Sequence, residues 1–238
     1  MPDERMDPRE HRKMLRGAVN RSDATALVRL LTEQPWPDQA LQLIGDGLFA
    51  ALDQHIADAT TVTAECIGRL RTRDWEGDAE LADQLGARVG SGPTPMLRPL
   101  PVRLEELAEM LEGDPVNCGG RIDLSNGDVW SRSSIEDAGS DSDEDEEDPG
   151  RWLWVDGLGS RAGYRDMRDF IDTTSDPTEA DRLGIAAEGR GAFRRFRGVL
   201  DRWPDELTRW SGFSEDRRLG RARAWLADAG YRPSTPRS

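Results

Sequence analysis

The residues of this sequence best suited to chemistry are arginines and glycines clustered shortly before position 200. A glycine–arginine–glycine triplet stands at the start of a predicted helix, and three more arginines follow within that helix. Free amide groups at a helix start, the positive end of the helix dipole and nearby guanidinium groups together suit a phosphate or a carboxylate. The predicted binding residues are Gly189, Arg190, Gly191, Arg194, Arg195 and Arg197.

The same residues also have a purely structural interpretation. The glycines would permit a tight turn between two helices, and the arginines would solvate an outer helix face, where charged side chains are usually found. At 100° per residue, the opposite side of this helix is apolar over about 120°. Its members are Phe193, Phe196, Val199, Leu200 and Trp203. We therefore expect Phe193 and Phe196 to be core residues.

Side chains that commonly carry catalysis are scarce. His11 and His55 lie on predicted helices, and neither has a Cys or Ser nucleophile motif beside it. Glu105 and Glu109 share an exposed helix face, where no burial separates their pKa values. We expect no catalytic residues, no cofactor and no metal. An enzyme would instead need a deep pocket in which carboxylates converge with Arg190.

Two motif matches fail because of their context. Residues 157–162 follow the Gly-x-Gly-x-x-Ala dinucleotide pattern, yet helices follow them instead of a second parallel strand. A turn with Ser160 as a helix cap is the preferred interpretation. The alternating carboxylates after residue 140 match the start of a calcium loop, but Glu146 stands where glycine is needed and Trp152 where the bidentate glutamate belongs.

The tryptophans are expected to be core anchors rather than base-stacking platforms. There are eight of them, and several fall on the apolar sides of predicted helices. Trp152 and Trp154 point to the same face of one predicted strand. An exposed aromatic pair on that strand would be the exception.

Negative charge is concentrated in one part of this 238-residue chain, whose net charge is -14. Residues 101–150 hold 3 basic and 16 acidic groups, whereas residues 151–238 hold 17 basic and 14 acidic groups. The sequence pI of about 4.7 argues against a protein that constitutively coats nucleic acid. A local site for anions is still compatible with the basic C-terminal part.

Cysteine usage and hydropathy favour a cytoplasmic protein. Cys66 and Cys118 are the only cysteines, and no Cys/His spacing predicts a disulfide framework or a zinc site. The first residues are charged and lack the apolar core of a secretory signal. No run approaches the roughly 20 apolar residues of a membrane span, so we expect no membrane partner.

Residues 1–90 predict a helical domain with short connections. Asp7-Pro8-Arg9-Glu10 is a capping box for a helix to about Ala18. Further helices are expected from Ser22, from Pro37 to Ile56, and in two later segments. Those two segments are Val62–Leu70 and Leu81–Val89. The helices could form a stack of αα-hairpins or a small irregular bundle.

Residues 91–101 are rich in proline and glycine and predict a linker. The following domain, residues 102–232, is expected to be α+β in an otherwise mainly helical protein. A helix is predicted at Leu104–Leu111, and a hairpin around Asn126-Gly127 with a strand at residues 151–155 predicts a small antiparallel sheet.

The remainder of this domain predicts one acidic loop and several helices. Residues 136–150 are expected to be disordered because seven carboxylates crowd eight positions with no apolar residue among them. A helix around Tyr164–Ile171 would cover the sheet. Three helices are predicted after residue 189, separated at Trp203-Pro204 and at Phe213-Ser214.

Residues 100–232 resemble uncharacterised protein family 0158, a bacterial family. The resemblance rests on the segment from Glu188 to Phe196, on Trp203-Pro204, and on Ala224-Trp225-Leu226 followed by Gly230-Tyr231. Further similar segments occur upstream in the same order. They are the Leu104–Leu111 helix, the Ile122–Trp130 hairpin, the acidic stretch and the Tyr164–Phe170 segment. The resemblance implies a shared fold and brings no catalytic residues with it.

Together these observations favour a non-enzymatic regulatory or interaction protein that binds a protein partner. The partner would contact the arginine-bearing helix face or the acidic loop. The alternatives are association with nucleic acid through the same arginines, and an enzyme whose site is built from Asp, Glu and Arg alone.

Overall fold

The computed structural model describes residues 7–115, 118–134, 148 and 150–234. The chain divides into two compact units, and one helix contributes to both. The N-terminal unit consists of Met1–Met96 with Glu215–Gly220, and the C-terminal unit of Leu97–Ser214 with Arg221–Ser238. The predicted acidic loop lies almost wholly outside the described residues.

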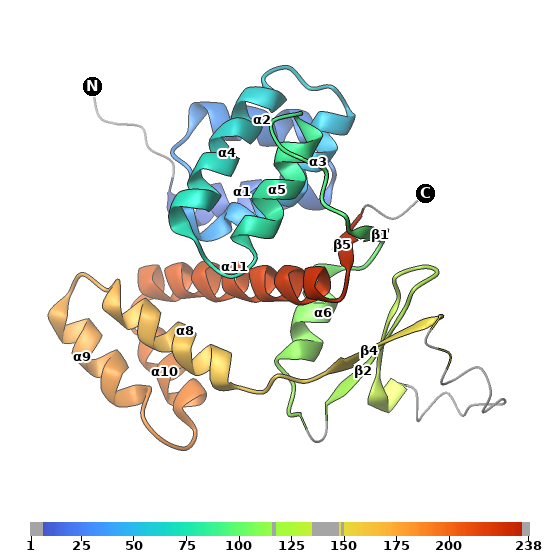
Figure 1. Cartoon of the computed structure of the whole chain (residues 1–238). Helices are drawn as coiled ribbons and strands as arrows, with labels where there is room; N and C mark the ends of the chain where they lie inside the picture. The colour runs from blue at the N-terminus through green and yellow to red at the C-terminus, as the bar shows by residue number, and fades with distance from the viewer. Residues whose placement is uncertain (1–6, 116–117, 135–147, 149, 235–238) are drawn as a thin grey trace, which may run out of the picture. The chain divides into compact units, whose positions relative to one another are not determined.

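The N-terminal unit is a bundle of short helices (Figure 1). They are α1 (Pro8–Asn20), α2 (Ala24–Glu33), the 3-10 helix η1 (Asp38–Ala40), α3 (Leu41–Asp53), α4 (Ala59–Arg73) and α5 (Asp78–Arg88). The predicted start of α1 is confirmed, since the Asp7 carboxylate accepts a hydrogen bond from the Arg9 amide at 2.9 Å. The second helix begins two residues later than expected because Asp23, not Ser22, caps it by accepting from the Ala26 amide.

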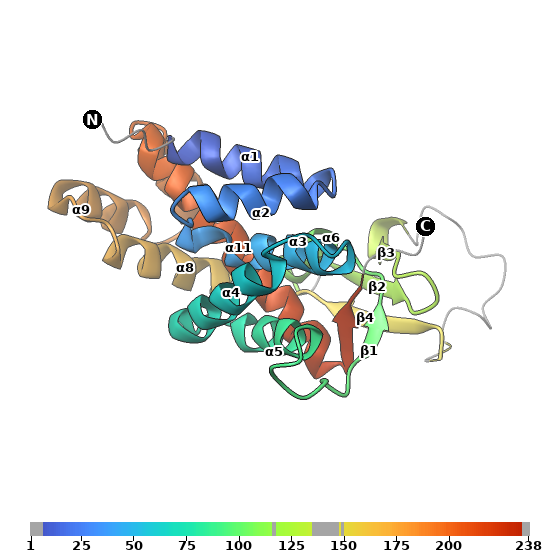
Figure 2. The same ribbon diagram turned by 90° about the horizontal axis from the view of Figure 1, so that it is seen from above.

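α3 is the central helix of this bundle. It packs against α1, α2, α4 and α5, whereas in a stack of hairpins each repeat would contact only its neighbours. Leu48 of α3 and Leu81 and Leu85 of α5 are completely buried. Figure 2 shows α1 and α2 side by side along one side of this group. The bundle is therefore the arrangement that the unit adopts.

Buried polar groups in the same unit are organised around Arg73. Its Nε and Nη2 donate to the two carboxylate oxygens of Asp78 at 2.9 and 2.6 Å, and its Nη1 donates to Asp216 at 2.5 Å. The Gln42 amide donates to Asp216 and its side chain donates to Asp78, both at 2.9 Å. Both aspartates are almost inaccessible to solvent. These bonds hold the Glu215–Gly220 segment in the N-terminal unit.

Burial changes the titration of groups in this unit. It raises the pKa of the Cys66 thiol to about 12, because a thiolate would lose its solvation there and would lie near Asp216. Burial also lowers the pKa of His11, whose Nε2 is inaccessible and has no hydrogen-bond partner in the described part of the chain. His11 is thus a packing residue.

A three-stranded antiparallel sheet forms part of the C-terminal unit, as predicted. The strands are β2 (Gly119–Asp123), β3 (Val129–Ser131) and β4 (Trp152–Asp156), in the spatial order β3-β2-β4. Helix α6 (Leu104–Leu111) packs against all three strands. The sequence-based helix and hairpin are both confirmed here.

A second sheet was not predicted. β1 (Arg98–Leu100) pairs in parallel with β5 (Tyr231–Pro233), so the end of the proline-rich segment expected to be a linker is a strand (Figure 1). The Arg98 guanidinium lies 4.4 Å from the centroid of the Tyr231 ring. The two strands are far apart along the chain, and no local pattern marks their pairing.

In the described part of the chain after residue 160, four helices belong wholly or partly to the C-terminal unit. They are α8 (Arg161–Asp172), α9 (Pro177–Ala186), α10 (Ala192–Leu200) and α11 (Pro204–Asp228). The break predicted at Phe213-Ser214 is wrong, because α11 continues through it for 25 residues. Phe213 and Leu219 are both buried, so the apolar spacing is satisfied without a break. Pro204 opens the helix as expected.

An aromatic cluster and one buried ion pair hold these helices together. The Phe170 ring makes edge contacts with Phe196, Trp210 and Phe213, at centroid distances of 6.3, 5.2 and 5.6 Å. Arg221 donates from Nη1 to Asp166 at 2.9 Å, and both side chains are buried. Among the described residues, no helix is both long enough and apolar enough to span a membrane.

Gly220 is expected to be essential to the N-terminal unit. A Cβ at this position would overlap the carbonyl oxygen of Glu76, which is backbone and cannot swing aside. Gly220→Ala should therefore lower the free energy of unfolding by about 1 to 3 kcal/mol or more. The matched control is Gly68→Ala in α4, where nothing lies within 4 Å, and where the same change should stabilise by about 0.5 to 1 kcal/mol. Equal effects of the two substitutions in urea denaturation would contradict this account.

His11 should make stability depend on pH just below neutrality. Its folded-state pKa lies below the ordinary value of 6.5, so the unfolded chain takes up a proton first as the pH falls through 6.5. Stability should then decrease toward pH 5, with a slope of at most about 1.4 kcal/mol per pH unit from this group. The measurement is the difference in unfolding free energy between wild type and His11→Phe at several pH values. A difference that stays constant from pH 7 to pH 5 would refute the assignment.

Candidate anion-binding site

The predicted binding residues lie in the short turn between α9 and α10 and in α10 itself: Gly189, Arg190 and Gly191 are in the turn, and Arg194, Arg195 and Arg197 are in the helix. α9 begins with a cap, because the Asp176 carboxylate accepts from the amides of Thr178 and Glu179 at 2.7 and 3.2 Å. The turn reverses the chain through Gly189 and Gly191, whose φ angles are +68° and +79°. Glycine adopts such angles at little cost, whereas a residue with a Cβ is usually strained there. The backbone of the turn therefore favours glycine at both positions, independently of any ligand.

Arg195 stabilises this turn from within α10. Its Nη1 donates to the carbonyl oxygen of Arg190 at 2.6 Å, and its Nη2 donates to the carbonyl oxygen of Glu188. The guanidinium thus donates to two carbonyl oxygens that the turn would otherwise leave without a donor. Of the six predicted residues, Arg195 has a visible structural task and the other arginines do not.

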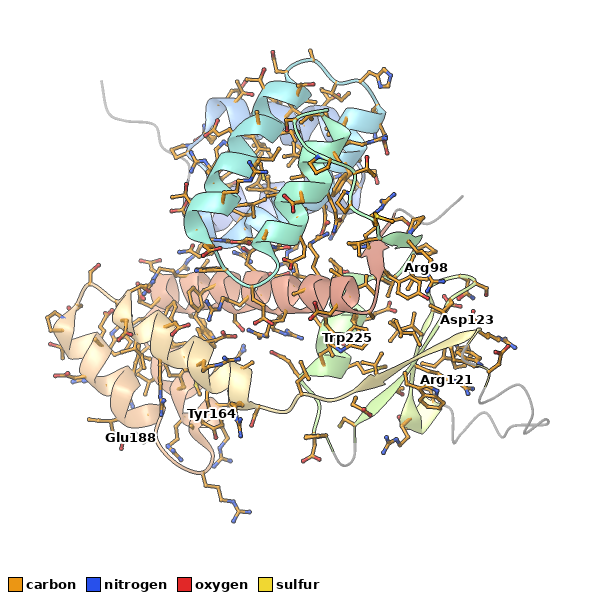
Figure 3. The ribbon with its side chains drawn as sticks, viewed as in Figure 1. Arg98, Arg121, Asp123, Tyr164, Glu188 and Trp225 are labelled. Carbon is orange, nitrogen blue, oxygen red and sulfur yellow. The ribbon has the colours of Figure 1, made fainter. Side chains whose placement is uncertain are left out.

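A cleft of about 620 Å³ opens on the α8 side of the turn. Figure 3 shows Tyr164 on α8 and Glu188 in the turn, both of which border it. The remaining lining residues come from α8, from α9 and from the turn. They are Arg168, Ile171, Asp172, Gly184, Ala187, Gly189 and Arg190. Two guanidinium groups, two carboxylates and one phenol therefore face a single opening.

A second groove, of about 570 Å³, runs between α9 and α10. Arg182 and Arg202 border it together with Arg195, and no acidic residue does. The apolar part of its lining comes from Ile185, Ala186 and Val199. Its lining is thus cationic and apolar at once.

The arginines of this region are exposed and carry uncompensated charge. Arg190, Arg194 and Arg197 are solvent-exposed, and none of them forms an ion pair within the described residues. α10 contains three arginines and no acidic residue in nine positions. This surface can therefore receive negative charge without first breaking ion pairs of its own.

The structure corrects the prediction that Phe193 is a core residue. Its side chain is 41% exposed and its ring lies against Tyr164 with a centroid distance of 4.7 Å. The buried stripe of α10 consists of Ala192, Phe196 and Leu200, and Phe193 lies at the edge of that stripe. Phe196, one turn later, is 1% exposed, as predicted. Ile185 is a second large apolar side chain left in solvent, at 74% exposure.

Other candidates from the sequence are not brought together. His11 lies in α1 and His55 is exposed after α3, so the two histidines share no site. Ser160 occupies the N-cap position of α8, but its side chain makes no capping hydrogen bond. The carboxylates compared with a calcium loop fall outside the described residues. In the described part of the chain, no group of three His, Cys, Asp or Glu side chains is arranged to hold a metal ion.

Sequence reasoning missed Tyr164, Arg168 and Arg182 as members of this region. Tyr164 and Arg168 are four residues apart and share one face of α8, a spacing that could have linked them. α9 itself was not predicted, although Asp176-Pro177 followed by Glu179 is a helix-start signal. Recognition of α9 would have placed Arg182 beside α10.

Comparison with known proteins finds a similar bacterial protein. No protein-family model matches the chain, and no solved structure matches it. The chain is 28% identical over 145 residues to UPF0158 protein PA5073 of Pseudomonas aeruginosa, a match that covers 60% of this chain and 92% of the relative. It confirms the resemblance to uncharacterised protein family 0158. The name of the relative states no activity.

Phe196 and Phe193 should differ sharply in their contribution to stability. Phe196→Ala removes a buried ring and should lower the free energy of unfolding by about 3 to 5 kcal/mol. Phe193→Ala removes a partly exposed ring and its contact with Tyr164, and should lower the free energy of unfolding by about 0.5 to 1.5 kcal/mol. Thermal or urea unfolding of both variants measures the difference. A Phe193→Ala variant as unstable as Phe196→Ala would contradict the exposure of this ring.

Proposed function

We propose that this protein is a non-enzymatic binding protein that takes an acidic segment of a partner protein on the surface around the α9–α10 turn. We call this the arginine surface and define it by Arg168, Arg190, Arg182 and Arg202 with the exposed Phe193 and Ile185.

The observation that carries the proposal is the combination of unpaired arginines with uncovered apolar side chains. Arg190 borders the first cleft and Arg202 the second groove. The exposed Ile185 also borders the second groove, and the exposed Phe193 packs on Tyr164 of the first cleft. Arginine and aromatic residues are enriched in the centres of protein interfaces. Exposed large apolar side chains beside them favour a partner that brings apolar groups of its own.

Acidic side chains fit this surface better than a nucleic-acid backbone does. Guanidinium groups bind carboxylates through two parallel hydrogen bonds. Asp172 and Glu188 also border the first cleft, and they would repel the closely spaced phosphates of a nucleic acid. A peptide can place its carboxylates against the arginines alone and leave neutral residues beside Asp172 and Glu188.

The test uses the full-length protein and a fluorescently labelled peptide of about twelve residues in which glutamate and leucine alternate. Binding is followed by fluorescence anisotropy at low salt and should weaken as salt screens the charges. Arg168→Glu with Arg190→Glu should lower the affinity about tenfold or more, equivalent to about 1.4 kcal/mol. The matched control is Arg29→Glu, an exposed arginine on α2, which should change the affinity little.

Two results would contradict the proposal. One is an affinity that is unchanged in the double variant while its melting temperature equals that of wild type. The other is equally tight binding of a peptide in which glutamine replaces every glutamate, since the arginines would then not be reading charge.

A second candidate function, an enzyme, is favoured by one observation. The first cleft gathers Asp172 and Glu188 with Arg168, Arg190 and Tyr164. The two carboxylates are solvent-exposed, however, and exposed carboxylates lack the burial that separates an acid from a base. Asp172→Asn with Glu188→Gln distinguishes the two functions. It should raise acidic-peptide affinity if the cleft binds peptide, by removing repulsion, and should abolish turnover if the carboxylates are catalytic.

A further inference from the structure

The groove between α9 and α10 is built from one side of each helix, and the two helices pack against each other (Figure 1). The α9 side carries three residues at helical spacing, which are Arg182, Ile185 and Ala186. The α10 side follows the same spacing with Arg195, Gly198, Val199 and Arg202. About 100° farther round the helices, Leu183 and Phe196 are buried in the core. The groove therefore lies on the outward side of the pair.

The middle of the groove is apolar and its floor is made of small residues. Ile185 is largely exposed, Val199 is partly exposed and Ala186 is buried below them. A Cβ at Gly198 would meet no described atom within 4 Å, although glycine within a helix is less favourable than alanine. No neighbouring group therefore requires a glycine here. Its missing side chain leaves room for the apolar groups of a partner.

Positive charge stands on both sides of this apolar middle. Arg182 belongs to the α9 side and Arg202 follows the end of α10. Both are exposed, and neither forms an ion pair within the described residues. Arg195 also borders the groove but is bonded to the turn carbonyls. Asp181 and Asp201 precede the two free arginines in the sequence, yet neither borders the groove. The groove thus favours an apolar stripe with carboxylates on both flanks.

A pair of exposed tryptophans on the three-stranded sheet lacks this charge pattern. Trp130 and Trp154 are 36% and 53% exposed, so the expectation that tryptophans are core anchors fails at these two positions. Arg121, which is in register between them, is buried. Asp128 and Asp156 are exposed on the same face of the sheet. Charge therefore selects no partner for the tryptophans, in contrast to the groove.

A helix matches the distribution of groups in the groove, whereas an extended chain does not. A helix can present one apolar stripe with acidic residues along both of its edges. The side chains of a strand point alternately toward and away from a surface, so a strand that inserts apolar side chains points its acidic ones away. A strand also needs backbone partners, and the walls of the groove are helices whose backbone groups bond internally. A helix satisfies its own backbone groups.

We propose that this groove, defined by Arg182, Ile185, Gly198, Val199 and Arg202, takes an acidic amphipathic helix of a partner protein. The apolar stripe of that helix lies over Ile185, Gly198 and Val199. Its carboxylates pair with Arg182 on one side and with Arg202 on the other. The inference rests on the proposed function, because it names the conformation of the acidic partner segment and its place on the arginine surface.

The experiment compares two labelled peptides of identical composition, each about sixteen residues long and thus long enough to form a helix. In one peptide the unit Leu-Glu-Glu-Leu is repeated, which gives a helical apolar stripe, and in the other leucine and glutamate alternate. Fluorescence anisotropy with the full-length protein at low salt gives both affinities. The helical-period peptide should bind about tenfold or more tightly than the alternating one. A proline in the middle of the helical-period peptide should remove this advantage, because proline breaks a helix.

Two glycine variants locate the helix on the protein. Gly198→Glu places a charged side chain in the groove and should weaken binding of the helical-period peptide about tenfold or more. The matched control is Gly184→Glu in α9, which borders the first cleft and where a Cβ would also meet no described atom within 4 Å. It should change the affinity little. Glutamate is a better helix former than glycine, so neither variant should have a lower melting temperature.

Equal affinities of wild type for the two peptides would overturn the inference, and so would an unchanged affinity in Gly198→Glu. If Arg168→Glu with Arg190→Glu still weakens binding in either case, the proposed function stands and the acidic segment lies in the first cleft. Absence of binding of both peptides to wild-type protein at low salt would contradict the inference and the proposed function together.

Discussion

Asp78 and Asp216 are buried carboxylates, and Arg73 is the cation that allows both to remain in the core of the N-terminal unit. Removing one member of such a group leaves an uncompensated buried charge, which typically costs 3 to 5 kcal/mol. The Gln42 amide donates to the second oxygen of Asp216, and its side chain donates to Asp78. Because Asp216 belongs to α11, this one cluster makes a six-residue segment near the C-terminus part of the N-terminal unit. The two segments also approach closely at Gly77 and Gly220, because a Cβ on either glycine would meet the backbone of the other segment.

In the region around the α9–α10 turn, Arg195 fixes the backbone that carries the neighbouring arginines. Arg195 is bonded to the turn carbonyls, so its neighbours are presented on a fixed backbone. A rigid turn reduces the entropy lost when a partner binds. Tyr164 holds the exposed Phe193 ring in place beside the turn. These contacts would hold the proposed arginine surface in one conformation before a partner binds.

Local patterns in the sequence predicted the helices and the hairpin that depend on capping residues, apolar spacing or turn residues. The capping residues of α1, the apolar spacing of α6 and the Asn126-Gly127 hairpin are all confirmed by the structure. The β1–β5 pair joins segments 133 residues apart at Arg98 and Tyr231, and no local pattern can show such pairing. Phe193 was placed in the core because helical periodicity does not show how wide the buried stripe of a helix is. The predicted arginines do lie together, but Arg168 and Arg182 come from helices that only the fold brings to them.

The most direct test of the arginine surface is nuclear magnetic resonance of the arginine Nε–Hε groups while the acidic peptide is added. Each exposed guanidinium that binds a carboxylate changes its chemical environment, and each buried one keeps it. The account predicts shifts for Arg168, Arg190, Arg182 and Arg202, and none for Arg73 or Arg221, which are held in buried ion pairs. Binding of the peptide with shifts confined to arginines outside this set, such as Arg29, would contradict it.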